Sequence, residues 1–447
     1  MGENMLQKLW EILHESKLEV EEILKTAKEG EVLQAHLVHG SIEDFNSCNL
    51  LYHGDNISAM VDLLNRGYKG KLDLIYIDPP FYTMNNYIKR VEVELNGERK
   101  VIEYKAYSDI WNSFEEYLKM LSIRLILMKE LMSSRGSIYV HVDFRTVHYL
   151  KVIMDEIFGV DNFINEIIWS YKSGGTSNRY FSRKHDSILF YSKTKDYIFN
   201  PVKEKSYNRQ YKAYRFKGVE EFQDELGWYT MVNSKDVWQI DMVGRSSKER
   251  VGYETQKPEK LLEKIILASS NENSIVGDFF SGSGTTLSVA HRLGRQWIGS
   301  DMSNSSLLTI KKRMSYANYL EFNFENHENF GDLILEIKNR VNNNTNTLKL
   351  DIKGYKVHVE SLNFTKKNRL LVEEVLYKDS LVLVDYIAII RLKDNFLIYE
   401  DFITKDKTRI DTDFEIHFND ENLGLIAIDI FGNKIFKELK LLVNINK

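Results

Sequence analysis

The stretch Leu72–Phe81, which reads LDLIYIDPPF, joins an apolar run to an acidic residue and a pair of prolines. The run Leu72–Ile77 has the length and composition of a buried strand. The whole chain contains four prolines, so two adjacent ones at the end of a strand indicate a rigid turn. Proline fixes φ and removes an N–H donor, and the residue before a proline is held extended. Asp78–Phe81 therefore presents a carboxylate, bare carbonyls and an aromatic face, which together suit a planar amino group.

Strands and helices alternate on both sides of this stretch. Short apolar runs predict strands at residues 50–53, 72–77, 136–142, 274–279 and 297–300. Apolar residues at helical spacing predict helices at residues 57–64, 114–132, 147–157, 261–268, 286–293 and 305 to about 319. This alternation is typical of an α/β fold, in which helices cover both faces of a mostly parallel, doubly wound sheet.

The remaining segments have a different pattern. Residues 1–45 carry apolar side chains at helical spacing and are expected to form a packing or dimer helix. Between about 165 and 250, aromatic and basic residues interleave without strand–helix alternation, which indicates an inserted segment. The polar run Asn342–Thr347 is expected to be a linker. Apolar runs beyond it predict strands of a small tail domain at residues 381–384, 388–390 and 423–428.

The composition is that of a soluble globular protein, since 43% of the 447 residues are hydrophobic and 28% are charged. No apolar stretch reaches the ~18–20 residues that a membrane span needs, and the first residues lack the features of a signal peptide. Cys48 is the only cysteine, which excludes intramolecular disulfides and disfavours a cysteine-built zinc site. These features predict a cytoplasmic protein. The net charge of −5 neither indicates nor excludes nucleic-acid binding, which depends on a local basic face.

A second motif, Asp278–Thr286, reads DFFSGSGTT and lies between a predicted strand and a predicted helix. Glycines at such a turn let a ligand approach the backbone, and the helix N-terminus offers free N–H groups. Asp301 follows the next predicted strand, where a carboxylate can accept hydrogen bonds from ribose hydroxyls. This order indicates an adenosine-containing cofactor, although glycine-rich turns also occur without ligands. A nicotinamide dinucleotide is disfavoured because Leu287 stands where its third glycine would be, and no Gly-Lys-Ser/Thr follows as in a P-loop.

Together with Thr255–Pro258, which reads TQKP, the two motifs resemble those of the S-adenosylmethionine-dependent amino methyltransferases of DNA. Asp78 at the first position resembles the adenine-N6 type, whereas the cytosine-N4 type usually has serine there. The tetrapeptide precedes the variable segment and the cofactor loop comes last. That order is similar to the circularly permuted β class and to modification subunits of type III restriction–modification systems. The resemblance covers roughly residues 50–320, and Tyr82 and Phe279 depart from it where asparagine and proline are common.

The resemblance implies a Rossmann-like methyltransferase fold with circularly permuted motifs and five segments. They are an N-terminal helical segment (1–45), a catalytic half (46–164), a target-recognition insert (165–250), a cofactor-binding half (251–340) and a small β-rich C-terminal domain of unassigned role (348–447).

The resemblance also implies a reaction, the transfer of a methyl group from S-adenosylmethionine to the N6 amine of an adenine flipped out of duplex DNA. The carboxylate of Asp78 and the carbonyl of Pro79 would accept the two amine hydrogens, and Pro80 would keep that carbonyl aimed. Phe81 would stack on the flipped base. No covalent enzyme intermediate and no metal are required.

The cofactor would lie in the second motif and at nearby positions. The implied cofactor-binding residues are Asp55, Thr255, Lys257, Pro258, Asp278, Phe279, Phe280, Gly282, Ser283, Gly284, Thr285, Thr286 and Asp301. Among them, Asp278 would contact the ammonium of the cofactor, Lys257 its carboxylate and Asp301 its ribose. Asp55 would accept a hydrogen bond from its adenine amine, or would simply cap the following helix.

The segment 165–250 would contact DNA phosphates and base edges, although an ordinary solvated surface is the alternative for many of its charges. The candidate DNA-binding residues are Lys172, Arg179, Arg183, Lys184 and Arg209. His141, His148 and His185 do not form a metal-ligand pattern and are expected to be structural.

The expected partners are double-stranded DNA, a restriction subunit and a second copy of the chain, with no membrane. Three alternatives remain open. The chain could methylate cytosine N4 or RNA, it could be a catalytically idle DNA-binding specificity subunit, or it could be a nicotinamide-dependent oxidoreductase, which Leu287 disfavours.

Overall fold

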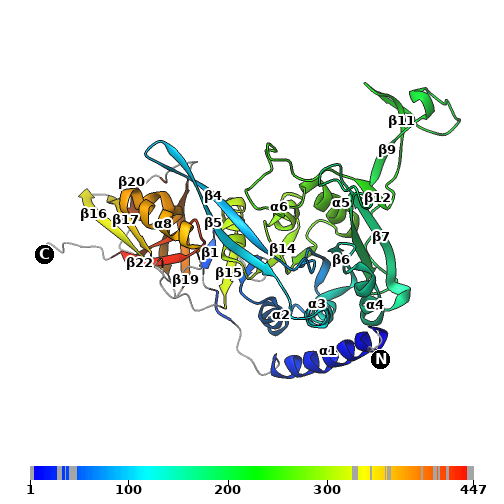
Figure 1. Ribbon diagram of the computed structural model, residues 1–447, viewed down its shortest axis with the longest axis horizontal. Coiled ribbons are helices and arrows are strands. Elements are labelled where there is room, and N and C mark those ends of the chain that lie inside the picture. The colour runs from blue at the N-terminus through cyan, green and yellow to red at the C-terminus, as the bar shows by residue number, and fades with distance from the viewer. Residues whose placement is uncertain are drawn as a thin grey trace.

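A computed structural model describes most of the chain (Figure 1). The described residues are 5–27, 33–35, 37–39, 48–324, 331–342, 345–357, 359, 364–393, 396–405, 410, 413–418 and 422–439. Among them, no helix is both long enough and apolar enough to cross a membrane.

The centre of the molecule is a parallel sheet, as the alternating pattern predicts. Its neighbouring strands, in spatial order, are β6 (Met132–Val142), β3 (Leu72–Ile77), β13 (Ile275–Asp278), β14 (Gln296–Asp301), β2 (Asn49–His53) and β15 (Tyr319–Asn323). All adjacent pairs in this series run parallel. Strands that are distant in the sequence therefore end side by side at one edge of the sheet.

Helices cover both faces of this sheet, so the fold is a doubly wound, Rossmann-like one. One face carries α1 (Met5–Ala27), α2 (Asn56–Asn65), α3 (Phe114–Leu131) and α4 (Val147–Phe158), and the other carries α5 (Glu259–Ser269), α6 (Thr285–Arg292) and α7 (Asn304–Arg313). Successive side chains of a strand point to opposite faces. Accordingly, Ile75 and Ile77 of β3 pack beneath the first set, whereas Leu74 and Tyr76 pack beneath the second.

The segment 165–250 contributes strands to the central sheet, which its pattern did not predict. Strands β7 (Phe163–Ser170) and β8 (His185–Ser192) extend the sheet antiparallel beyond β6, and the 3-10 turn η1 (Val160–Asn162) precedes them. Strand β12 (Val237–Gln239) then pairs parallel with β7. The residues between form a finger of three strands, β9 (Lys203–Tyr207), β10 (Phe222–Asp224) and β11 (Gly227–Asn233), with the 3-10 turn η2 (Arg209–Tyr211). Figure 1 shows this finger projecting from the body of the molecule.

A long hairpin follows the tetrapeptide and was not predicted. It consists of β4 (Asn85–Leu95) and β5 (Glu98–Asp109), which pair antiparallel, and we call it the arm. Its turn is Asn96-Gly97, with φ of +53° and +79°. An Asn-Gly dipeptide between alternating apolar residues is the strongest short-range signal for a hairpin, so the sequence did contain the information that predicts the arm. In Figure 1 the arm runs across the molecule to the C-terminal part.

The C-terminal part holds the arm in place. It contains α8 (Lys366–Asp379), the 3-10 turn η4 (Ser380–Leu383) and strands β16 (Gly331–Asn342), β17 (Thr345–Val357), β18 (Val384–Lys393), β19 (Phe396–Thr404), β20 (Asp413–Phe418), β21 (Asn422–Asp429) and β22 (Lys434–Leu439). Apolar side chains of the arm, including Ile102, are buried in the hydrophobic core of the C-terminal part. The phenol of Tyr104 donates to the carbonyl of Ile430 at 2.7 Å.

Several predicted boundaries were wrong. Strand β1 (Leu37–His39) lies within the segment predicted to be helical, and it joins β15 to β19 so that one sheet runs through both parts of the molecule. Helix α7 ends at Arg313 rather than at about residue 319, where strand β15 begins instead. The polar run at Asn342–Thr347 is not a linker, since Asn342 pairs with Thr345 in the β16–β17 hairpin, with residues 343–344 outside the described part. Residues 381–383 form η4 rather than a strand, whereas the predicted strands at 388–390 and 423–428 are present.

Candidate active site

Four carboxylates meet at the edge where the parallel strands end. Asp78 follows β3, Asp278 ends β13, Asp301 ends β14, and Asp55 lies two residues beyond the end of β2. The register brings Asp301 opposite His53. Ligands of open α/β sheets bind at the carboxyl ends of the strands, so the two motifs predicted from the sequence form one site.

Asp78 occupies the centre of this site. Its Oδ2 is bonded to the ammonium of Lys257, and this ion pair is largely shielded from solvent. Its Oδ1 is buried, and no hydrogen-bond donor reaches it within the part of the chain that the structure describes. A buried carboxylate oxygen without a donor is costly, so this atom is a ready acceptor for an incoming N–H group.

Aromatic side chains of α3 contact the end of the tetrapeptide and the residue that follows it. The carbonyl of Pro80 accepts a hydrogen bond from the phenol of Tyr117 at 2.7 Å. The ring of Phe81 is half-buried, and the ammonium of Lys257 lies 5.4 Å from its centroid. Tyr82 has a φ of +58° and packs edge-on against Phe114, with ring centroids 4.9 Å apart. Left-handed backbone at a bulky residue is strained, and here it turns the Tyr82 ring toward α3.

The glycine loop between β13 and α6 requires its glycines. Gly282 and Gly284 have φ of +48° and +70°, a region that other residues rarely adopt. A Cβ on Gly284 would lie 2.8 Å from Cγ1 of Ile310. Asp301 anchors the loop, because its two carboxylate oxygens accept N–H groups of Gly282 and Ser303, each at 2.8 Å.

The loop also contacts the TQKP motif. The hydroxyl of Thr285 donates to the backbone carbonyl of Lys257 at 3.2 Å and lies 2.9 Å from the hydroxyl of Ser283. Pro258 is the N-cap residue of α5, and Thr255 precedes it in the same half-buried turn. The two motifs therefore form one continuous wall of the site.

Among the predicted cofactor-binding residues, the two phenylalanines differ in position. Phe280 is half-buried beside the loop, whereas the side chain of Phe279 is fully buried in the core with the first set of helices. The backbone carbonyl of Phe279 accepts a hydrogen bond from Nδ2 of Asn56 at 2.8 Å. Thr286 is buried in the first turn of α6.

Two of the carboxylates have raised pKa values. Burial raises the pKa of Asp278 to about 7, and the charges of Asp78 and Asp301 act in the same direction, against hydrogen bonds from Thr286 and the Phe280 N–H. Burial also raises the pKa of Asp301, although its two backbone N–H bonds oppose the shift. A cationic group placed among these carboxylates would relieve their mutual repulsion.

Asp55 does not cap helix α2 through its side chain, although it occupies the N-cap position. Its carboxylate instead pairs with the guanidinium of Arg124 at 2.7 Å. Arg124 also donates to the side chain of Asn56 at 2.5 Å. This arrangement fixes the Asp55 carboxylate at the edge of the site.

The candidate DNA-binding residues lie on two separate elements. Lys172, Arg179, Arg183 and Lys184 belong to the loop between β7 and β8, and Arg209 belongs to the finger. Within the loop, Arg183 stacks on the ring of Phe144, 3.8 Å from its centroid. Lys184 differs, because its ammonium is bonded to the carbonyls of Ser173 and Gly174.

The sequence interpretation missed a histidine in the active site. His141 of β6 is fully buried, and its Nδ1 lies 3.9 Å from Oδ1 of Asp78 and 2.8 Å from the hydroxyl of Tyr76. Its Nε2 lies 3.2 Å from Oδ2 of Asp186 on β8. Tyr76 is on β3, and Asp78 follows two residues later, just beyond the end of that strand. That spacing of two suggests that both side chains lie on the same side of the sheet, which the sequence could have indicated. The apolar run Ile188–Tyr191 could likewise have identified β8.

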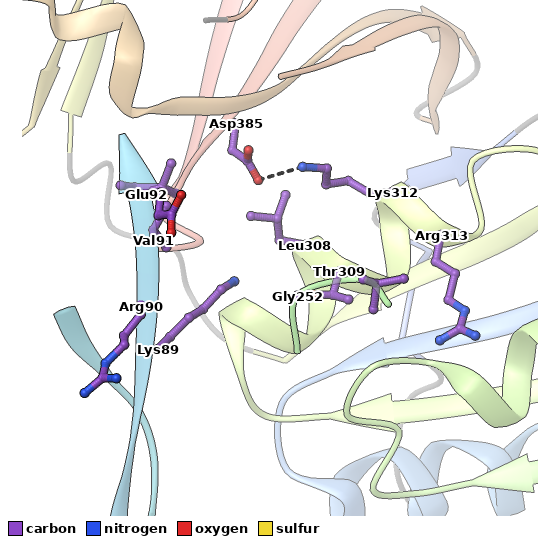
Figure 2. Close-up of a pocket in the computed structure, with 12 residues that line it drawn as sticks. Lys89, Arg90, Val91, Glu92, Gly252, Leu308, Thr309, Lys312, Arg313 and Asp385 are labelled. Carbon is purple, nitrogen blue, oxygen red and sulfur yellow. Dashed lines mark hydrogen bonds and ion pairs between the residues drawn. The ribbon is translucent and has the colours of Figure 1, made fainter. Parts of the chain in front are cut away.

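A pocket of about 400 Å³ lies where the arm, α7 and the C-terminal part meet (Figure 2). None of the residues that line it belongs to the predicted cofactor or catalytic set. Figure 2 shows Lys312 facing Asp385, and these two are bonded at 3.0 Å. The ammonium of Lys89 donates to the hydroxyl of Ser305 on α7 at 2.9 Å.

The other two cations at this pocket also have partners. Arg90 pairs with Glu103 across the arm at 2.8 Å, and Arg313 pairs with Glu259 at 2.6 Å. Arg313 further donates to Thr285 of the glycine loop at 3.0 Å. Three of its four cations are thus bonded to carboxylates, and we interpret the pocket as a structural junction behind the loop.

Within the described residues, no group of three or more His, Cys, Asp and Glu side chains is arranged to hold a metal ion.

The comparison with known families decides the class of this site. The profile of the DNA methylase family, which comprises N6 and N4 enzymes, matches residues 72–312, more than half of the chain. The chain belongs to the DNA methylase family. The matched region includes the tetrapeptide, the TQKP motif and the glycine loop, which is the resemblance that these residues predicted.

This methylase is similar to several named proteins. It is 30% identical over 269 residues to type II methyltransferase M2.LlaDCHI of Lactococcus lactis subsp. cremoris, covering 60% of this chain and 89% of that relative. It is 26% identical over 175 residues to the Mod subunit of the type III restriction-modification enzyme EcoP15I of Escherichia coli, covering 36% of this chain and 27% of that subunit. Among solved structures, the M1.HpyAVI–SAM complex has 22% identity and a TM-score of 0.40, covering 59% of this chain and 98% of the other.

Proposed function

We propose that this DNA methylase transfers a methyl group from S-adenosylmethionine to the N6 amine of an adenine flipped out of duplex DNA. The observation that carries the proposal is the buried Oδ1 of Asp78, which has no donor in the described structure, in the same turn as the half-buried ring of Phe81. An exocyclic amine stacked on that ring would supply the missing hydrogen. Its nitrogen lone pair would then be less delocalised into the base, because the hydrogens are held out of the plane of the ring.

The residues around the glycine loop fit S-adenosylmethionine. The cofactor carries an ammonium, ribose hydroxyls and an adenine amine, all of which are hydrogen-bond donors, and the edge of the sheet offers the acceptors Asp278, Asp301 and Asp55. The left-handed Gly282 and Gly284 leave no side chain between backbone and ligand. When bound, S-adenosylmethionine would supply an electrophilic methyl group carried by a sulfonium sulfur.

The chain itself would contribute mainly position. Asp78 and the carbonyl of Pro79 accept the two hydrogens of the target amine, while Tyr117 fixes Pro80 and thereby the turn. Phe81 stacks on the base, a contact worth ~1–3 kcal/mol. Holding the amine in line with the methyl group converts a bimolecular encounter into an oriented one, which is a large share of the catalysis in such reactions.

Recognition of DNA would fall to the loop between β7 and β8 and to the finger. Arg179 and Arg183 are exposed on the loop, and Arg209 is exposed on the finger. Phosphate contacts from these residues would position the duplex, and a subset would read base edges. The name of the type III Mod relative supports a place in a restriction–modification system with a restriction subunit as partner. A second copy of the chain is a further proposed partner.

The choice of adenine rests on the aspartate at position 78, because the cytosine-N4 type usually has serine there. Incubation with tritiated S-adenosylmethionine and duplex DNA of mixed sequence, followed by nucleoside analysis, tests the choice. We expect label in N6-methyladenine, none with Asp78→Ala, and an unchanged yield with the exposed control Asp161→Ala. Label in N4-methylcytosine would refute the adenine assignment. Absence of label in both bases would favour an idle specificity subunit.

Flipping is tested separately with duplexes that carry 2-aminopurine at the target position. We expect its fluorescence to rise on binding, because the base leaves the stack. Unchanged fluorescence in a duplex that is bound and methylated would argue against flipping.

A further inference from the structure

A histidine and a second carboxylate lie directly behind the catalytic turn. His141 is fully buried on β6, next to β3, and its Nδ1 is 3.9 Å from Oδ1 of Asp78. On its other side, Nε2 is 3.2 Å from Oδ2 of Asp186. Asp186 is itself held by the phenol of Tyr171 at 3.2 Å. The arrangement is a base with an orienting carboxylate, and its Nδ1, which the hydroxyl of Tyr76 contacts at 2.8 Å, faces the reacting centre.

The neighbours of His141 determine where its protons lie. The ionised carboxylate of Asp186 can only accept, so Nε2 carries the hydrogen of that bond. Burial raises the pKa of Tyr76 well above its usual value, and the charges of Asp78, Asp278 and Asp186 add to this, so its hydroxyl stays protonated. Tyr76 therefore donates to Nδ1, so the lone pair of Nδ1 is held in this bond, 3.9 Å from Oδ1 of Asp78.

The proposed reaction creates a proton that this pair could receive. When the amine nitrogen bonds to the methyl carbon and the carbon–sulfur bond breaks, the nitrogen keeps both hydrogens and becomes cationic. One N–H bond must then break for the neutral methylated amine to form. The bonded acceptor of that hydrogen is Asp78, and its Oδ1 lies 3.9 Å from Nδ1 of His141, so a second base stands beside the carboxylate to receive the proton.

We propose that His141, oriented by Asp186, takes the surplus proton of the methylated amine through Asp78. The N–H bond of the product breaks, Oδ1 of Asp78 relays the proton, and an N–H bond forms at Nδ1 of His141 after Tyr76 releases it. The resulting imidazolium lies against the carboxylate of Asp186. This role rests on the proposed function, and it makes His141 and Asp186 positioning and proton-accepting residues rather than ligands of the base.

The charges around His141 support this direction of transfer. Asp78 and Tyr76 face His141 from the β3 side, and Asp186 faces it from β8. The ring of Trp169 on β7 lies edge-on to the imidazole, with the two ring centroids 5.2 Å apart. Burial would raise the pKa of Asp186, but the hydrogen bond and charge of His141, together with Lys257, lower it overall. Asp186 thus stays ionised and compensates a positive imidazole.

The experiment compares His141→Gln and Asp186→Asn with the exposed control His148→Gln in the full chain. Steady-state turnover, which includes the loss of the surplus proton, is measured from pH 5.5 to 9, with dissociation constants for S-adenosylmethionine and DNA. We expect His141→Gln to slow turnover by ~10²-fold, with both dissociation constants within about threefold of the wild type. Asp186→Asn should move the acid limb of the rate profile to lower pH, and His148→Gln should change neither.

Histidine NMR of the free protein supplies a readout that needs no activity. His141 is assigned by the resonance lost in His141→Gln, and its Nε2–H resonance should move in Asp186→Asn, because the carboxylate that accepts this hydrogen is gone. A wild-type rate in His141→Gln, or equal losses at every pH without a shift in the profile, would overturn the role. If the wild type methylates nothing, the proposed function fails, while the NMR spectrum still reports whether Asp186 holds His141.

Discussion

Lys257 is bonded to Asp78, and the same ammonium lies over the ring of Phe81. One cation therefore bonds Oδ2 of the acceptor carboxylate and lies over the ring on which the target base would stack. Lys257 is also the residue predicted to contact the carboxylate of the cofactor. Cofactor binding would draw the ammonium away from Asp78 and open the place of the base.

This relationship predicts that the cofactor product S-adenosylhomocysteine tightens DNA binding about tenfold, a coupling of ~1.4 kcal/mol. The coupling should be lost in Lys257→Met, which cannot hold Asp78. Fluorescence anisotropy of a labelled duplex, with and without the product, measures both affinities. Lys260→Met, on the exposed side of α5, is the matched control and should keep the coupling. Equal coupling in Lys257→Met would mean that the ion pair does not gate the site.

A second prediction concerns the pH dependence of cofactor binding. The pKa of Asp278 is raised to about 7, chiefly by burial, so the carboxyl is largely protonated below that pH and cannot accept an ammonium as an anion. The affinity for S-adenosylmethionine should therefore rise about tenfold between pH 5.5 and 7.5. Calorimetry in buffers of different ionisation enthalpy should detect proton release at pH 7. Asp278→Asn should bind more weakly and with little pH dependence, whereas the exposed Asp236→Asn should behave as the wild type.

The same shift has a consequence for the free protein. A carboxyl whose pKa is higher in the folded state costs stability as the pH rises from its unfolded value near 4 through 7. Asp278→Asn should therefore raise the Tm more at pH 8 than at pH 5. A larger gain at pH 5 would contradict the direction of the shift.

A third prediction concerns the glycine loop. Gly284→Ala places a Cβ 2.8 Å from Ile310 in a backbone with φ of +70°. We expect a loss of about 1–3 kcal/mol in the free energy of unfolding, from strain and displacement of α7, and weaker cofactor binding. Urea titration and calorimetry measure the two effects. Gly175→Ala, with no atom within 4 Å of the added Cβ, should be neutral.

A fourth prediction concerns the arm. Ile102 is fully buried in the core of the C-terminal part, so Ile102→Ala should cost about 2–4 kcal/mol at that interface. The arm should then detach more often and be cut by trypsin faster than in the wild type. Its neighbour Val101 is 45% exposed, and Val101→Ala should leave both the Tm and the cleavage rate unchanged. Equal cleavage in the two variants would mean that this contact does not hold the arm.

Much of the fold was readable because its signals are local. An apolar run of six residues before Asp-Pro-Pro predicts a buried strand and a stiff turn wherever it occurs, and Leu72–Ile77 is that strand. The arm was equally local and could have been predicted from Asn96-Gly97. The strands β7 and β8 were not predicted, because the loop between them is rich in interleaved aromatic and basic residues. That composition is typical of a surface segment, so the whole stretch was interpreted as an insert without strands.

The sequence by itself determined the two turns that define the chemistry, since proline fixes its own φ and glycine admits the left-handed backbone that other residues rarely adopt. Which side chains meet at those turns was decided by the tertiary structure alone. Lys257 reaches Asp78 across 179 positions, and His141 meets Asp186 because β6 and β8 pair in one particular register. The order and register of strands depend on burying both faces of the sheet at once, a condition that no single segment of sequence expresses.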